Sequence, residues 1–460
     1  MYQLINNIIL EFRKKVKREK TFRWFAILVI GLMVRVSRAG VTSVIGALRL
    51  DPGVYHKMLH YFRSKAYKVT ELYGRWMEVA MKYGTMVRIC GRLMLIGDHI
   101  KVSKEGLRMP GVHVMHQDSE NSGKGSYITG HQYGQVGAVL TNGRVSRSIP
   151  LITELQRSPA KGEKGDSLVT QMAKLAVETA KTLKERTVVA LDAYFCKNTA
   201  WEVIDQTLNA DGERQVELVT RGRKNTVAYR VPVPPTGKKR GQPPKYGEKV
   251  ALMGLFSDKG RFTETTMEVY GKKARVRYLC LDLIWKPVKK LVRFVLAEID
   301  GGRCILMSSS LTLGPEDIIT VYTLRFKIEP SFDEQKNDVG SFDYRFWSAS
   351  LRKRGKWQNA APSPNENVDA AARAAQSFVC LSTIATGILS LIAFSHNREI
   401  WSLFPGWLKT LRSDVPSIAT VKSAIAASFH DFLPSLAHLK VFAFFKPIIR
   451  KIDFLFSDFA

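Results

Sequence analysis

Four polar side chains near residue 330 have types and a spacing suited to chemistry on a phosphate. Tyr322, Arg325, Glu329 and Lys336 occur at offsets of 0, 3, 7 and 14 residues, which at about 100° per residue puts all four on one side of a helix. Burying a hydroxyl, a guanidinium, a carboxylate and an ammonium without partners would be costly. The stripe therefore predicts either a solvated helix face with ion pairs between turns or a surface for phosphate and metal.

Two aspartates upstream follow apolar strand patterns. We expect Asp98 at the end of the strand that begins RLMLIG, and Asp192 between the short strand TVVAL and a helix. Apolar strands separated by helices indicate an α/β layer, and such folds build sites at strand ends. If Asp98, Asp192 and Glu329 converge, their three carboxylates would need cations, and all-oxygen ligation suits Mg²⁺ or Mn²⁺. Two such ions about 4 Å apart support in-line phosphoryl transfer.

The charge balance indicates a polyanionic partner. The chain of 460 residues, long enough for two or three domains, has 70 Lys and Arg against 41 Asp and Glu, a net charge of +29. DNA is the leading partner and a membrane surface is the competing one. The apolar runs 24–34 and 378–394 are shorter than the ~20 clean apolar residues of a membrane span. We therefore expect core helices and no membrane partner.

The termini and cysteines favour a cytoplasmic protein. The N-terminal stretch lacks a small-residue cleavage site after an apolar core, so no secretory signal is expected. The five cysteines have no CxxC spacing, which predicts reduced thiols and no structural zinc. His113 and His116 are spaced like zinc ligands, but further soft ligands are missing nearby.

Residues 1–90 are expected to be helical and to bind DNA. A helix pattern over 40–50, the turn Asp51-Pro52-Gly53 and a second helix over 54–65 are typical of a helix-turn-helix whose second helix enters the major groove. Lys57 and Arg63 lie on the polar side of that helix. A helix pair that binds nothing has the same pattern and remains an equal alternative.

Strands dominate the middle of the chain, with a hairpin turn at Asn142-Gly143 and a helix over about 167–183. The stretch 221–249 has nine Lys or Arg against one acid, which predicts a solvated loop that touches phosphates. The cations expected to bind DNA there are Arg221, Lys238, Lys239 and Arg240. More strands follow to about 308, and Gly314-Pro315 opens the helix with Tyr322.

The segment Tyr322-x2-Arg325-x3-Glu329-x6-Lys336 resembles the YREK signature of bacterial insertion-sequence transposases of the DDE superfamily, with every spacing matched. The flanks ILMSSSLTLGPEDIITVYTLRFKIE and PGWLKTLR are also similar, and the resemblance covers about 90–412. It implies a ribonuclease-H-like core with Asp98 on the first strand, Asp192 at the end of the fourth and Glu329 on a later helix. It also implies a strand-rich insertion, which we place at about 221–312.

The resemblance assigns Tyr322, Arg325 and Lys336 to the phosphates of the transposon end, which suits a guanidinium and an ammonium. Trp285 is the candidate for stacking a flipped base, although an ordinary cross-strand aromatic fits the same position. Pro330 directly follows Glu329 and predicts a kink that could move Lys336 off the shared face. The implied partners are double-stranded DNA of the transposon ends and target, and a second copy in a synaptic homodimer.

We therefore expect an α/β protein with a ribonuclease-H-like catalytic core in two parts, 91–220 and 313–395. The core would be flanked by the helical DNA-binding domain 1–90, the basic β-rich insertion 221–312 and a helical C-terminal region 396–460. The expected activity is DNA cleavage at transposon ends and strand transfer with two Mg²⁺ or Mn²⁺ ions, in a bacterial cytoplasm at the nucleoid. The alternatives are a ribonuclease-H-like nuclease without strand transfer and a catalytically inactive DNA-binding protein.

Overall fold

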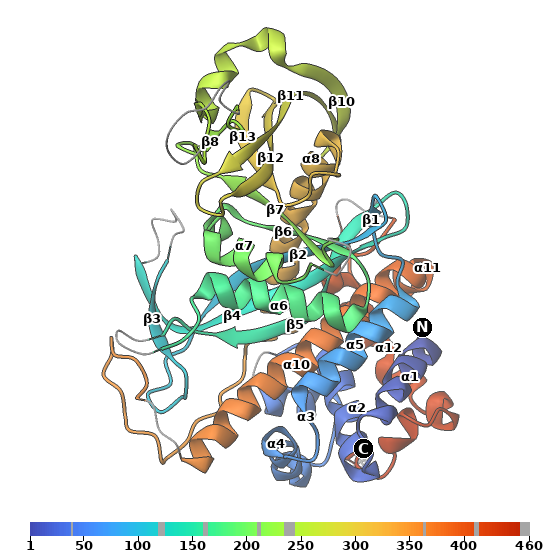
Figure 1. Cartoon of the computed structure of the whole chain (residues 1–460). Coiled ribbons are helices and arrows are strands. Elements are labelled where there is room, and N and C mark those ends of the chain that lie inside the picture. Colours follow the sequence, from blue (N-terminus) through green and yellow to red (C-terminus); the bar gives the residue numbers. More distant parts are fainter. Residues whose placement is uncertain are drawn as a thin grey trace, which may run out of the picture.

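The computed structural model describes residues 1–37, 40–117, 125–159, 164–208, 213–233, 244–361, 365–408 and 414–450. These residues form an α/β protein around one large mixed sheet (Figure 1). Five strands make its centre in the order β5-β4-β2-β6-β7. Their bounds are β2 (Arg92–Ser103), β4 (Tyr127–Thr141), β5 (Ser146–Gln156), β6 (Thr187–Leu191) and β7 (Val216–Gly222). Strands β2, β4 and β5 are antiparallel, whereas β2, β6 and β7 run parallel.

The alternation of side chains divides the central sheet between two apolar clusters. Leu93 and Leu95 of β2 join the cluster that contains α6 (Leu168–Leu183), while Met94 and Ile96 join the cluster that contains α8 (Pro315–Leu324). Because successive side chains of a strand point to opposite faces, α6 and α8 cover opposite faces of the sheet. Side chains of even number in this part of β2 therefore face α8.

The expected hairpin and helix are both present. Strands β4 and β5 are joined through Asn142 and Gly143, and Gly143 has a φ of 87°, which glycine adopts without strain. Helix α6 begins after Ser167, whose side chain accepts a hydrogen bond from the backbone N–H of Thr170 at 3.2 Å. Strand β6 is followed by the 3-10 turn η3 (Ala193–Phe195) and by α7 (Asn198–Asp205).

One strand boundary differs from the expectation. The sequence pattern ended the first strand at Asp98, but β2 continues to Ser103 and remains paired with β4 over that whole length. The residues after Asp98 alternate between apolar and polar, as a half-buried strand does. Asp98 therefore lies within β2, opposite Gln135 of β4.

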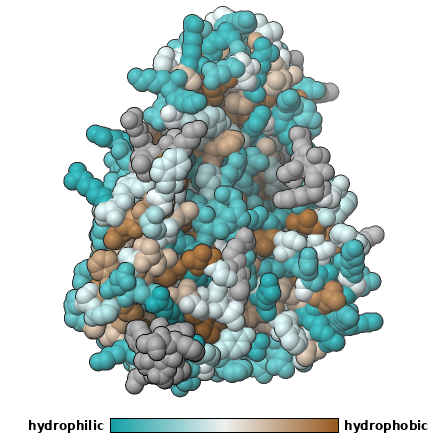
Figure 2. Space-filling model, turned by 180° about the vertical axis from the view of Figure 1, so that it is seen from behind, coloured by the Kyte–Doolittle hydropathy of each residue, from teal (hydrophilic) through white to brown (hydrophobic). Residues whose placement is uncertain are grey.

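The strands after β7 form an upper lobe that extends the sheet (Figure 1). They are β8 (Val227–Tyr229), β9 (Lys249–Ala251), β10 (Thr263–Val269), β11 (Lys272–Trp285), β12 (Lys290–Ile299) and β13 (Gly302–Ser308). Strand β13 returns beside β7. On the face that Figure 2 draws, hydrophilic residues cover the top of this lobe, with some hydrophobic ones among them. Two short strands, β1 (Arg88–Ile89) and β3 (His113–His116), pair with β2 and β4.

The helices from both ends of the chain share one core. The N-terminal ones are α1 (Tyr2–Glu11), α2 (Glu19–Val34), α3 (Val41–Ala47), α4 (Tyr55–Arg63) and α5 (Val69–Tyr83). The C-terminal ones are α10 (Glu366–Ser395), α11 (Asn397–Leu403) and α12 (Ile418–Phe432). Helix α10 packs against α2, α4, α5, α12 and strand β5 (Figure 1). A single apolar cluster thus runs from Met1 to Phe445.

Helix α10 is the one described helix that is long and apolar enough to cross a membrane, with a mean hydropathy of 2.0 in its most apolar window. Of that window, 94% is buried inside the protein. This burial agrees with the core helix that the sequence predicts for residues 378–394.

The helix expected after Gly314 changes its hydrogen-bonding pattern three times. After α8 come a 3-10 turn η6 (Arg325–Lys327), α9 (Ile328–Asp333) and a π-helical turn η7 (Glu334–Val339). Pro330 falls in the first turn of α9, where its missing N–H leaves no helix bond unmade. The irregularity expected at Pro330 therefore takes the form of the 3-10 turn directly before α9.

Candidate active site

Asp98 and Asp192 lie side by side where the parallel pairing of two strands ends. The last parallel pairs of β2 and β6 are Ile96 with Ala190 and Gly97 with Leu191, and the aspartates are the next residues. Asp98 lies two residues after Ile96, and Asp192 lies two residues after Ala190. Ile96 and Ala190 both belong to the apolar cluster that contains α8. Both carboxylates are therefore expected on the face of the sheet that α8 covers.

Arg325 connects this pair to the helix. Its Nη1 donates to Oδ2 of Asp98 at 3.2 Å and its Nη2 donates to Oε1 of Glu329 at 3.2 Å. The hydroxyl of Tyr322 lies 3.4 Å from Oδ1 of Asp192. The structure thus brings together the three carboxylates and two of the helix side chains singled out in the sequence.

Burial sets the electrostatics of the cluster. The pKa of Asp98 is raised to about 6, with burial as the largest cause; Asp192 and Glu329 also act to raise it, while the His99 backbone N–H and Arg325 act to lower it. Burial acts to lower the pKa of Arg325, but the surrounding acids outweigh it and hold this pKa above its usual range. Burial also raises the pKa of Tyr322. The site is a partly desolvated group of acids held by one buried cation.

The donor set fits a divalent cation such as Mg²⁺ or Mn²⁺. Within the described residues no three His, Cys, Asp or Glu side chains are close enough together to hold a metal ion as they lie. The guanidinium of Arg325 lies among the carboxylates instead, and its buried Nε has no hydrogen-bond partner in the described part of the chain. Carboxylate oxygens are the ligands that Mg²⁺ prefers. Arg325 therefore stands where a cation of that kind would neutralise the acids.

A cavity of about 510 Å³ opens beside the aspartates. Asp98 and Asp192 line it together with His99 and the exposed Tyr194. His99 Nε2 lies 2.8 Å from Oε1 of Gln156, and burial lowers the pKa of His99 to about 4. The imidazole is thus neutral at pH 7 and can hydrogen-bond a ligand without attracting its charge.

Two aromatic residues beside the site, Tyr270 and Phe326, were not predicted from the sequence. Tyr270 occupies the two-residue turn between β10 and β11 with a φ of 52°, and its ring centroid lies 5.0 Å from that of Phe326. Burial raises the pKa of Tyr270, and Arg325 and Glu329 also act on it. The dipeptide Tyr270-Gly271 between two alternating strands is a hairpin signal that could have located this turn.

The remaining predicted DNA contacts are scattered. Arg221 is exposed on β7 and acts electrostatically on Tyr322. Lys57 and Arg63 are exposed on α4, and Lys336 is half-buried in η7. Lys238, Lys239 and Arg240 lie outside the described residues.

Trp285 lies in the core. It is 7% exposed and packs on Trp201 of α7 with ring centroids 5.5 Å apart. The indole would have to leave this contact before it could stack on a base. Its placement matches the ordinary aromatic role that the sequence also allowed.

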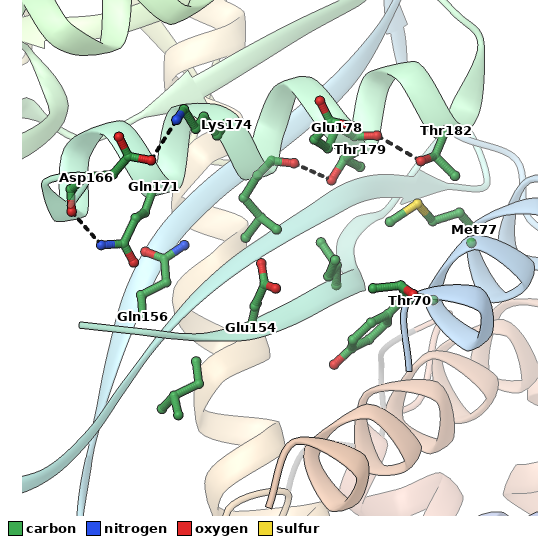
Figure 3. A pocket seen from close by; sticks show the side chains of 15 residues that line it. Thr70, Met77, Glu154, Gln156, Asp166, Gln171, Lys174, Glu178, Thr179 and Thr182 are labelled. Atoms are coloured by element: carbon green, nitrogen blue, oxygen red, sulfur yellow. Dashed lines mark hydrogen bonds and ion pairs between the residues drawn. The ribbon is translucent and has the colours of Figure 1, made fainter. Parts of the chain in front are cut away.

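A second cavity, also of about 510 Å³, lies between α5, β5 and α6. Figure 3 shows Glu154 and Gln156 of β5 on one side of it, and Lys174 and Glu178 of α6 on the other. None of the three site carboxylates lines this cavity. Gln156, which lines this cavity, contacts His99 beside the site.

Comparison with known proteins identifies the family. A search of curated proteins found no match. The sequence model of the DDE superfamily endonucleases matches residues 11–278, a region that includes Asp98 and Asp192 and ends before Glu329. Because this match spans more than half of the chain, the protein belongs to the DDE superfamily endonucleases, a family of nucleases and transposases that act on DNA.

Proposed function

We propose that the chain is a transposase of the YREK-signature family, which cleaves DNA at the ends of its own element and joins those ends to target DNA. The observation that carries the proposal is the convergence of Asp98, Asp192 and Glu329 on Arg325. These acids come from two neighbouring strands and from a helix on one face of the sheet. The strand order β5-β4-β2-β6-β7 supports a ribonuclease-H-like core.

In this proposal the three carboxylates would hold two Mg²⁺ or Mn²⁺ ions. Such an ion, when bound, neutralises phosphate charge and lowers the pKa of water. Water attacks the terminal phosphodiester, whose P–O3′ bond breaks to leave a 3′-hydroxyl on the element and a 5′-phosphate on the flanking DNA. This 3′-hydroxyl then attacks a target phosphodiester, forms a new P–O bond and expels the 3′-hydroxyl of the target strand. Arg325 can grip a phosphate through two N–H groups, and Tyr322 can donate its hydroxyl to a phosphate oxygen. Burial around Asp98 keeps bulk water from screening these interactions.

Other parts of the chain take the DNA-binding roles in the proposal. Helix α4 presents Lys57 and Arg63 to the major groove, and Arg221 with the basic stretch that follows it contacts phosphates. Lys336 extends the phosphate site. The boundaries 1–90, 221–312 and 396–460 delimit the helical DNA-binding, insertion and C-terminal regions. A synaptic homodimer and a bacterial cytoplasm complete the proposal.

A cleavage assay tests the catalytic assignment. The substrate is DNA that carries the sequences flanking the gene, incubated with Mg²⁺ and the full chain. Asp98→Ala and Glu329→Ala should lose cleavage and keep DNA binding. Asp282→Ala is the matched control, because Asp282 pairs with Arg293 at 2.7 Å in the insertion. Full cleavage by either site variant would exclude this assignment.

A strand-transfer assay separates the proposal from its alternatives. A precleaved end with a free 3′-hydroxyl is incubated with supercoiled target DNA. Products joined to the target support a transposase. Cleavage of flanking DNA without joined products identifies a nuclease that only hydrolyses, and binding without either product identifies an inactive DNA-binding protein.

A further inference from the structure

Two exposed tryptophans stand among cations on the segment 343–358, away from the three carboxylates. Trp347 is 58% exposed and Trp357 is 59% exposed. The same segment carries the exposed cations Arg345, Arg352, Lys353 and Lys356, and the exposed Arg108 lines a cavity together with Trp347. We propose that this surface, named the Trp347–Trp357 surface, binds unpaired nucleotides of DNA, with bases stacked on the indoles and phosphates on the cations. The proposal goes beyond cleavage and strand transfer, since it holds for a chain that cannot cleave.

The backbone of the segment explains why these side chains face solvent. Tyr344 and Phe346 are buried, and the ring centroid of Phe346 lies 5.4 Å from that of Phe62. Arg345 and Trp347 alternate with them and therefore point outward. The core is complete without the exposed indole, so Trp347 is available to a ligand.

The surface is held in place by the loop after β2. The N–H of Ser348 donates to the carbonyl of Arg108 at 3.1 Å, and the N–H of Arg354 donates to the carbonyl of Leu107 at 3.0 Å. The buried guanidinium of Arg354 also donates to the carbonyls of Lys104 and Gly106, each at 3.2 Å. Anchored backbone of this kind presents aromatic rings with little loss of freedom on binding.

A cavity of about 820 Å³ opens at the surface. Arg108, Arg345, Trp347 and Lys353 line it on the basic side. It also contains two acids, the exposed Glu105 and Asp343, whose Oδ2 lies 4.0 Å from Nη2 of the buried Arg35. The volume lies in the range of clefts that bind small ligands and suits a nucleotide.

The chemistry favours an unpaired strand over duplex DNA. A base can stack on an indole only when its face is free, whereas phosphates of a duplex need cations alone. Lys356 Nζ lies 5.8 Å from the ring of Trp357, so a stacked base would also meet a positive charge. The net charge of +29 makes a polyanion the matching partner.

The loop that anchors the surface leaves the same strand that carries Asp98. It begins directly after Ser103, five residues beyond Asp98 on β2, a distance of roughly 16 Å along an extended strand.

Oligonucleotide binding tests the proposal. The full chain, in EDTA so that no cleavage occurs, is titrated into fluorescein-labelled dT12 and into a labelled 12-base-pair duplex, and anisotropy is recorded. Stacking on one ring contributes about tenfold in affinity per base. Trp347→Ala with Trp357→Ala should therefore weaken dT12 binding at least tenfold and change duplex binding less than twofold. Replacement of both by Phe should restore most of the dT12 affinity.

Trp407→Ala is the matched control, because Trp407 is 83% exposed and lies after α11, outside the surface. It should leave dT12 binding unchanged. Unchanged dT12 binding in a double variant with a wild-type circular dichroism spectrum would overturn the proposal. Equal losses of affinity for dT12 and for the duplex would also overturn it. The same conclusion would follow if the double variant lost binding to vesicles of phosphatidylcholine and phosphatidylserine but kept its affinity for dT12. Asp98→Ala should bind dT12 like the wild type, so a failure of the catalytic assignment is seen separately.

Discussion

The guanidinium of Arg325 donates to the carboxylate of Asp98 at 3.2 Å across 227 residues of sequence. This contact joins β2 of the sheet to the helical segment that carries Glu329. It also puts a fixed positive charge at the point where acids crowd together.

Removal of this charge should destabilise the protein in a pH-dependent way. Arg325→Ala leaves buried carboxylates without their cation, which is expected to lower the free energy of unfolding by about 3 kcal/mol at pH 8. At pH 5 the loss should be smaller, because the pKa of Asp98 is raised to about 6 and its carboxyl is already protonated. Urea unfolding at both pH values measures the difference. Arg293→Ala, whose partner Asp282 is partly exposed, should lose less than about 1 kcal/mol at either pH.

Divalent cations should stabilise the fold through the same acids. A ligand at ten times its Kd raises the free energy of unfolding by about 1.4 kcal/mol, so Mg²⁺ or Mn²⁺ should raise Tm measurably. Asp98→Asn and Asp192→Asn should remove this rise, whereas Asp282→Asn should keep it. Differential scanning calorimetry with and without EDTA makes the comparison, and an equal rise in all four proteins would place the ions elsewhere.

Glu334 gives a second pH dependence. Burial raises the pKa of Glu334 to about 7 despite Arg147, whose Nε lies 3.9 Å from Oε1 of the carboxylate. A carboxyl with a raised pKa contributes stability that is complete below its unfolded pKa of 4.5 and is lost as pH rises through about 7. Glu334→Gln has no carboxyl to titrate at this position and does not show this loss. The free energy of unfolding of the variant minus that of the wild type should therefore increase by about 2 kcal/mol from pH 5 to pH 8. Parallel curves for the two proteins would contradict the assignment.

Gly387 of α10 permits close packing against α5. A Cβ at this position would overlap the indole ring of Trp76, which is fixed by a 2.8 Å hydrogen bond from its Nε1 to the carbonyl of Pro150. Gly387→Ala should therefore lower the free energy of unfolding by about 3 kcal/mol. Gly46→Ala in α3 is the control, since a Cβ there meets no described atom within 4 Å. It should stabilise the helix by up to about 1 kcal/mol.

The cations of α4 should contribute to duplex binding through phosphates. Lys57→Ala with Arg63→Ala should reduce the slope of log K against log salt by about 1.8 if each contacts one phosphate. Both side chains are exposed, so Tm should not change. Lys15→Ala, an exposed cation after η1 (Phe12–Lys14), is the control. An unchanged slope in the double variant would remove α4 from the DNA interface.

Local patterns were sufficient to predict the elements around the site. The apolar strand before Asp192, the helix over about 167–183 and the hairpin at Asn142 each depend on neighbours within a few residues, and all three occur as expected. The shared face of Tyr322, Arg325 and Glu329 also follows from helical spacing alone. The alternation within β2 and β6 could have placed Asp98 and Asp192 on one face as well.

Contacts between distant residues could not be predicted in this way. Whether Trp285 is buried depends on Trp201, 84 positions earlier, and no periodicity reports such a pair. The alternation after Asp98 indicates that the strand continues, but it does not identify the fifteen residues of β4 as the pairing partner. Tyr270 lies near Glu329 only because β10 and β11 fold back over the helix.

The apolar cluster that joins the two ends of the chain has a consequence for synthesis. Tyr2 contacts Phe432, Phe442 and Ser428, and Phe22 contacts Phe444. At about 5–20 residues per second, the ribosome needs roughly 20–80 s between the first helices and these partners. During that interval the aromatic side chains of α1 and α2 emerge without their final neighbours. We therefore expect the native packing of the first helices to be completed only after the C-terminal segment has been synthesised.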